Sequence, residues 1–292
     1  MSSHGSYYLP DPSPYPVITS AGLFSLALGF ILMIHELALG PWLMLLGAAI
    51  IIFIMFRWFG KVIGESEAGT YDRQVDFSFR WGMAWFIFSE VMFFGAFFGA
   101  LFYIRMFAVP WLGETELLWP GFEADWPTAG PEGAIALQPH ETPGPGQFTP
   151  MAAWGIPAIN TLILLSSGVT ITFAHWGLLK DNRGQLITFQ FLTLVLGILF
   201  LVLQVDEYVH AYMELDLTLK TGVYGATFFM LTGFHGFHVT MGTIMLTVIL
   251  VRCMKGHFTP QHHFGFEAVA WYWHFVDVVW LFLFVFVYWL AV

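Results

Sequence analysis

The chain has 292 residues, of which 58% are hydrophobic and only 10% are charged, and its formal net charge is -10. Soluble domains carry about 25% charged residues, so this deficit excludes an ordinary soluble protein and predicts an integral membrane protein. The negative charge argues against a nucleic acid partner, and the single cysteine, Cys253, excludes an internal disulfide and a Cys-rich metal site.

Residues 1–16 are polar and rich in proline, and they lack the pattern of a cleavable signal peptide. Seven later stretches are apolar and long enough to cross a membrane, which takes about 20 helical residues. In chain order they are 17–34, 37–56, 81–104, 157–179, 185–205, 221–251 and 264–292. The short break between the first two predicts a helical hairpin. The expected fold is all-α, a polytopic membrane protein with seven transmembrane helices.

The cationic residues predict the orientation. Eight of the ten Lys and Arg residues lie on one side, in the connections between spans two and three, four and five, and six and seven: Arg57, Lys61, Arg73, Arg80, Lys180, Arg183, Arg252 and Lys255. Only Arg105 and Lys220 lie on the other side. By the positive-inside rule the N-terminus is cytoplasmic and the C-terminus lies outside.

The one long connection, at about 107–156, holds no Lys or Arg and six acidic residues. Its prolines are Pro110, Pro120, Pro127, Pro131, Pro139, Pro143, Pro145 and Pro150. Proline at this density does not sustain a helix or a central strand, so we expect an irregular, acidic external loop. Such a loop could steer a basic electron donor, or it could simply be solvated or contact another subunit; both readings stay open.

Glu90 is the one acidic residue inside the third span, ten positions after Arg80. A rise of about 1.5 Å per residue puts it roughly 15 Å deep, near the bilayer midplane. An ionisable group at that depth needs a partner or a function. It is either a proton-linked or lipid-facing carboxyl that tunes a neighbouring subunit, or a neutral acid hydrogen-bonded across a helix interface.

His235 and His238 lie one turn apart on the sixth span, at a spacing that can chelate a metal. Further ligands could come only from Glu267, His274 and Asp277, which share one face of the seventh span. A hydrogen-bonded structural network between helices is therefore favoured over a metal site, and a proton relay along that face is the alternative. No metal site is expected.

Asp206, Glu207 and His210 end the fifth span at the outer surface, where we expect solvent to account for them. The chain has no Gly-rich phosphate loop, nucleophile elbow or zinc-protease helix, so no catalytic residue is predicted.

Cations lie beside aromatic residues at the cytoplasmic ends of spans two and six. This pairing suits lipid phosphates, although the cations could also serve only to set the topology.

Four segments resemble cytochrome c oxidase subunit III. The longest is HHFGFEAVAWYWHFVDVVWLFL at 262–283, similar to the last helix of that family. The others are PSPYP at 12–16, FSEVMFF at 88–94, and GVYGATFF at 222–229 running on to TGFHGFHV at 232–239. The resemblance covers all seven spans.

The resemblance implies a two-helix hairpin and a five-helix bundle with a lipid-filled, V-shaped cleft between them, divided as residues 1–63 and 64–292. It implies a non-redox subunit of a proton-pumping, respiratory cytochrome c oxidase that stabilises subunit I and supports its proton uptake. The chain itself would bind structural phospholipids and no other cofactor. Haem a, haem a3, CuA and CuB would belong to the partner subunits I and II, and cytochrome c could dock near the acidic external face.

By the same resemblance Glu90 matches the family's carbodiimide-reactive carboxyl. Positions near the family's cleft lipids are matched by Trp58, Glu65, Arg80, Arg252, Lys255, His257 and Phe258. Gly64 stands where mitochondrial members have an arginine, and Tyr71-Asp72 stands about where they have a histidine, so the chain departs from part of the family's set of phosphate contacts. The long external loop favours a bacterial aa3-type member in the cytoplasmic membrane.

Three alternatives stay open. The nearest is subunit III of a quinol oxidase of the same superfamily, which typically has five spans, and the first hairpin argues against it. A histidine-dependent membrane metalloenzyme needs more His-x-x-His pairs than the chain offers. A proton-coupled transporter would move solute by itself.

Overall fold

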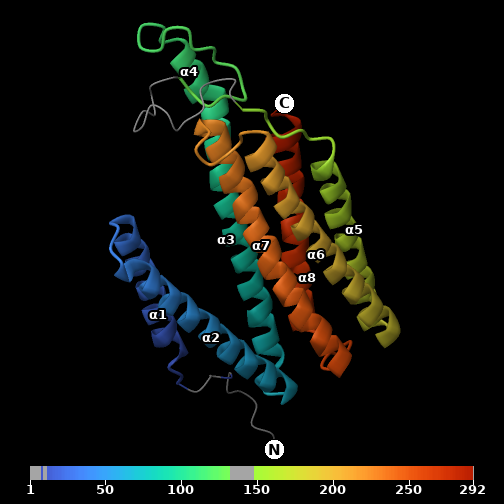
Figure 1. Ribbon diagram of the computed structural model, residues 1–292. Helices are drawn as coiled ribbons and strands as arrows, with labels where there is room; N and C mark the ends of the chain where they lie inside the picture. Colours follow the sequence, from blue (N-terminus) through green and yellow to red (C-terminus); the bar gives the residue numbers. More distant parts are fainter. Residues whose placement is uncertain (1–7, 9–11, 132–147, 292) are drawn as a thin grey trace, which may run out of the picture. The chain divides into compact units, whose positions relative to one another are not determined.

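The computed structural model describes residues 8, 12–131 and 148–291. The elements in chain order (Figure 1) are α1 Tyr15–Ile34, α2 Leu39–Glu67, α3 Arg73–Tyr103, the π-helical η1 Ile104–Ala108, α4 Val109–Gly113, α5 Ile156–Leu179, α6 Arg183–Glu214, α7 Gly222–Lys255, α8 Phe264–Leu283 and the π-helical η2 Phe284–Trp289. Within the described residues, seven helices are long and apolar enough to cross a membrane. The predicted all-α fold with seven spans is confirmed.

Several helices run past the ends that hydropathy predicts. The second span was expected to end at residue 56, whereas α2 continues to Glu67. The extension carries Lys61 and Glu65, whose charged groups lie 3.6 Å apart one helical turn from each other. Such residues are good helix formers, so hydropathy marks where the apolar layer ends and not where the helix ends.

The chain divides into two compact units, Met1–Trp81 and Gly82–Val292. In the first unit α1 packs against α2, which confirms the predicted hairpin. Its contact is made at buried glycines, among them Gly22 and Gly47. A Cβ atom on Gly47 would lie 2.6 Å from the Gly22 carbonyl oxygen and 2.6 Å from the Leu26 amide nitrogen. Only hydrogen at this position allows the two backbones to approach so closely. The domain boundary after residue 63 and the lipid-filled cleft stay predictions.

In the second unit α5, α6, α7 and α8 form a helical bundle (Figure 1). Helix α8 is the most buried of the seven spans. Its Trp273 indole donates a hydrogen bond of 2.8 Å to Ser167 Oγ on α5, and its Trp280 indole donates one of 2.9 Å to Thr161 Oγ1 on the same helix. The Trp280 ring also packs edge-on against Phe200 of α6, with centroids 4.7 Å apart. Helix α8 is therefore the centre around which its neighbours pack.

The long external connection begins later than expected. The predicted irregular segment from about residue 107 is helical through η1 and α4, as far as Gly113. Pro110 lies in the first turn of α4, a position that tolerates the missing N–H of proline. The Val223 amide bonds to the Ala129 carbonyl and the Thr149 amide to the Leu215 carbonyl, which ties the described loop ends to the α6–α7 connection.

Some predicted features lie outside the described residues. They are most of the polar N-terminal segment, Val292 at the end of the seventh span, and the loop prolines Pro139, Pro143 and Pro145.

Glu207 is not solvated, contrary to the expectation from its place near the end of the fifth span. Helix α6 continues to Glu214, so Glu207 lies inside the helix, where it is only 1% exposed. Its Oε1 accepts a hydrogen bond of 2.6 Å from the Tyr288 hydroxyl on η2. Asp206, one position earlier, points outward and is exposed. The buried carboxyl therefore joins the last span to α6.

Gly47→Ala should weaken the hairpin, because the new methyl group meets backbone atoms that cannot turn away. Overpacking of this kind costs about 1–3 kcal/mol. The measurement is the thermal unfolding midpoint of the purified protein in detergent. Gly60→Ala on the same helix is the matched control, since nothing lies within 4 Å of its Cβ position. Equal midpoints for the two variants would contradict the proposed close packing.

Tyr288→Phe should also lower the thermal midpoint, because it removes the hydroxyl that donates to Glu207. A buried polar group left without its partner costs about 1–3 kcal/mol. Tyr212→Phe is the control, because the Tyr212 side chain is exposed. If Tyr288→Phe and Tyr212→Phe unfold at the same temperature, the Glu207 contact does not stabilise the fold.

Candidate functional site

Glu90 of α3 and His238 of α7 form a hydrogen-bonded pair inside the spans. The Glu90 Oε2 and His238 Nε2 atoms lie 2.8 Å apart, and the two side chains are 22% and 9% exposed. The other ring nitrogen, Nδ1, lies 2.6 Å from the Phe234 carbonyl oxygen, which can only accept. Nδ1 therefore carries a hydrogen, and the contact between Nε2 and the carboxyl holds one further proton. The geometry is that of a single proton shared between a carboxyl group and an imidazole.

Aromatic rings surround this pair. The His238 ring lies 5.0 Å from Phe94 and 6.3 Å from Phe275, measured between centroids. The Tyr272 hydroxyl, from α8, donates a hydrogen bond of 3.4 Å to the His238 carbonyl. Such an apolar shell excludes water and strengthens the hydrogen bond inside it. The pair joins α3 to α7 where both also contact α8.

His235 points to another helix. Its Nε2 lies 3.0 Å from the Val276 carbonyl oxygen on α8, and its ring lies between Phe200 and Trp280. The two histidines of the His-x-x-His pair therefore bond to different neighbours. Among the described residues, neither belongs to a group of three side chains that could hold a metal ion.

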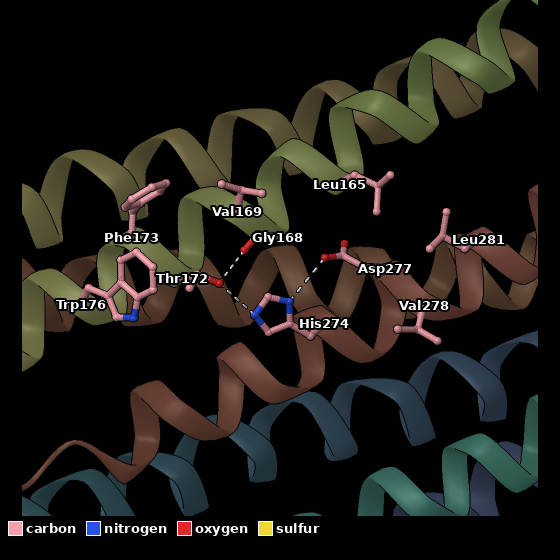
Figure 2. A pocket seen from close by; sticks show the side chains of 10 residues that line it. All are labelled: Leu165, Gly168, Val169, Thr172, Phe173, Trp176, His274, Asp277, Val278 and Leu281. Atoms are coloured by element: carbon pink, nitrogen blue, oxygen red, sulfur yellow. Dashed lines mark hydrogen bonds and ion pairs between the residues drawn. The ribbon is translucent and has the colours of Figure 1, made fainter.

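The predicted polar face of the seventh span divides into two groups. Near the middle of α8, Asp277 Oδ2 lies 3.7 Å from His274 Nδ1, and His274 Nε2 lies 3.4 Å from Thr172 Oγ1 on α5. Figure 2 shows these three side chains in one cluster, with Gly168 opposite Asp277. Glu267, at the start of α8, instead lies beside His175 and His263.

A groove of about 420 Å³ lies over His274 and Asp277. Figure 2 shows that side chains of α5 and α8 line it. The apolar lining residues are Leu165, Val169, Phe173, Trp176, Val278 and Leu281. The walls are thus hydrophobic, and the polar groups are confined to one patch.

The predicted lipid-contacting residues of the first unit already have protein partners. Trp58 stacks on Tyr15, with ring centroids 5.8 Å apart. Glu65 accepts a hydrogen bond of 2.7 Å from the Tyr71 hydroxyl. Burial of Tyr71, and then this bond to the carboxylate, raise the pKa of the Tyr71 hydroxyl. The Arg80 guanidinium lies 2.8 Å from Asp76.

In the second unit the predicted lipid contacts gather where α7 ends. The Arg252 guanidinium lies over the Phe258 ring, 4.4 Å from its centroid. Gly256 ends the helix in the left-handed conformation, with φ +77, and the His257 amide bonds to the Arg252 carbonyl. Lys255 is exposed in the last turn. Cationic groups beside an aromatic ring provide a surface suited to an anionic headgroup.

Two features were missed by the sequence reasoning. Glu207 was assigned to solvent, and His175 was assigned to no site. The apolar stretch of the fifth span ends before Glu207, so hydropathy does not indicate that the helix continues past this residue. His175 lies far from His263 along the chain, and only the fold brings the two together.

Comparison with known proteins identifies the family. The family described as "Cytochrome c oxidase subunit III" matches residues 4–292. The chain is 42% identical to cytochrome c oxidase subunit 3 of Marchantia polymorpha over 278 residues, which cover 95% of this chain and 93% of that protein. It is 42% identical to that of Chondrus crispus, covering 93% and 89%, and 40% identical to that of Drosophila melanogaster, covering 95% and 94%.

The similarity extends over nearly the full length of both chains, and it agrees with the seven spans and with the hairpin. The chain belongs to the cytochrome c oxidase subunit III family and is a multi-pass membrane subunit of a respiratory terminal oxidase.

Proposed function

We propose that this chain stabilises subunit I of a bacterial aa3-type cytochrome c oxidase, supports its proton uptake and holds structural phospholipids. Subunits I and II would carry haem a, haem a3, CuA and CuB. The chain would lie in the cytoplasmic membrane with its N-terminus inside, because most Lys and Arg residues lie in connections on one side. The observation that carries the proposal is the partly buried Glu90–His238 pair, a proton-holding group inside the spans.

The role in proton uptake rests on what this pair can do. A carboxyl group and an imidazole that share one proton are neutral overall wherever the proton lies between them, so the proton can shift within the pair without leaving an isolated charge in the apolar layer. Glu90 is only partly covered by this chain, so a neighbouring subunit can reach it. We infer that the pair influences the field and hydration at the contact with subunit I, rather than serving as an obligatory step of the pump.

The role in lipid retention rests on the end of α7. Arg252 has its flat face on Phe258, while Lys255 stays exposed beside it. A lipid phosphate can approach the edge of the Arg252 guanidinium and the ammonium group of Lys255. A lipid held there would contribute to the surface that docks onto subunit I.

Two experiments separate this proposal from its alternatives. A subunit II with a CuA domain that co-purifies with the chain favours cytochrome c over quinol as electron donor. Stoichiometric iron bound to the isolated chain would instead favour a histidine-dependent metalloenzyme and overturn the proposal.

Arg252→Ala should release phospholipid and shorten the active lifetime of the assembled enzyme, because it removes the cation held over Phe258. The measurement is the phospholipid content of the purified complex by mass spectrometry, together with the decay of oxygen consumption during turnover. Lys220→Ala, an exposed cation in the connection before α7, is the control. Unchanged lipid content in Arg252→Ala would count against the proposal.

Glu90→Gln should leave most proton pumping intact. The amide N–H can donate to His238 Nε2, because Nδ1 already donates to the Phe234 carbonyl. Glu90→Leu should lose about 1–3 kcal/mol of stability, because it leaves His238 unpaired in an apolar shell. The measurements are protons pumped per electron in reconstituted vesicles and the thermal midpoint of the complex. An assembled Glu90→Gln enzyme that pumps no protons would refute the proposed accessory role.

A further inference from the structure

We propose that His175, His263 and Glu267 form a binding site for one zinc ion. The site would join the end of α5 to the start of α8. It goes beyond the proposed function, which assigns no metal to this chain, and it revises the expectation that the sequence offers no metal site.

The three side chains come from two helices and the connection before the second. His175 lies in the last turns of α5, His263 directly precedes α8, and Glu267 lies in the first turn of α8. One potential ligand atom from each lies within 4.8 Å of the other two. Among the described residues, these three form the one group of His, Cys, Asp or Glu side chains with this spacing.

The separations are too long for good hydrogen bonds and slightly longer than those between ligands of one ion. Glu267 Oε1 lies 3.6 Å from His263 Nε2 and 3.9 Å from His175 Nε2. Good hydrogen bonds between such atoms are about 2.7–3.2 Å long. Ligands of a tetrahedral zinc ion with bonds of about 2.0–2.1 Å lie roughly 3.3–3.4 Å apart. Small side-chain rotations therefore bring the three atoms onto one ion.

The backbone orients His263 as a ligand. Its Nδ1 lies 3.1 Å from the Thr259 carbonyl oxygen, which accepts and cannot donate. Nδ1 of the neutral ring therefore carries the hydrogen, and the lone pair of Nε2 faces the Glu267 carboxylate. Two electron-rich atoms facing each other are stabilised by a cation between them. A ring N–H bonded to a backbone carbonyl is also the usual support of a metal-bound histidine.

The chemistry of the three side chains selects the ion. Two imidazoles favour zinc over calcium or magnesium, which prefer all-oxygen sites. Two neutral imidazoles and one carboxylate leave a net charge of +1 and a fourth position for water. His263 is buried, whereas Glu267 and His175 are partly accessible, at 16% and 26%, so an ion would enter past these two side chains.

The site would act as a clamp between α5 and α8. The Phe266 ring packs 5.5 Å from His175, and Phe258 packs against Phe266 in turn. This row of rings leads to the Arg252 guanidinium over Phe258. Zinc would thus hold in place the connection that presents the cationic end of α7. An ion that binds only the folded protein also raises its stability by mass action.

The test uses the intact oxidase complex, titrated with Zn²⁺ alone. Bound zinc is counted by equilibrium dialysis and metal analysis in the parent and in the Glu267→Gln and His175→Asn variants. We expect both variants to lose one zinc equivalent and the rise in thermal midpoint that zinc produces in the parent. His262→Asn, an exposed histidine next to the cluster, is the matched control and should keep both.

The proposal is overturned if the parent and both variants bind the same number of zinc equivalents with the same affinity. Should a variant fail to assemble, the parent complex decides alone. Crystals soaked in Zn²⁺ should give an anomalous peak at the zinc edge among His175, His263 and Glu267. Anomalous peaks at other positions with none here would overturn it equally.

Discussion

Inside the apolar layer no water is present to complete a hydrogen bond, so polar groups within a span have to be satisfied by other parts of the protein. This constraint explains why the polar side chains of this chain point where they do. Glu90 meets His238, His235 meets the Val276 carbonyl, and Glu207 meets Tyr288. Each bond joins two different helices. The polar residues that are costly in lipid thus become the contacts that decide which helices are neighbours.

Helix α8 illustrates how that constraint shapes packing. Lipid is as apolar as a leucine side chain, so close packing and hydrogen bonds have to hold transmembrane helices together. Trp273 and Trp280 provide both, because each ring is fully buried while its indole N–H reaches a hydroxyl on α5. Gly197 and Gly242 make room for the Trp273 ring: a Cβ atom on either would lie 2.8 Å from it. Large rings on one helix are thus matched by small residues on the next.

Hydropathy was sufficient to predict the seven spans and the hairpin, because both follow from the thickness of the apolar layer and the shortness of the break after the first span. It could not predict where helices end, since charged residues such as Lys61 and Glu65 continue a helix as readily as apolar ones. The same limit hid Glu207. Hydropathy places that residue at the membrane edge, whereas its burial depends on η2, a segment distant in sequence.

The histidines show why spacing alone is a weak guide to a metal site. His235 and His238 have the spacing of chelating ligands, yet their rings turn to α8 and α3, because each ring bonds through Nε2 to its own partner on one of those helices. His175 and His263 have no spacing that suggests a site, yet the packing of α5 against α8 brings both to one carboxylate. A local motif fixes only the separation of two residues along the helix that carries them. The tertiary fold decides whether their lone pairs converge, and here it favours convergence at the helix ends, where an ion can enter from water.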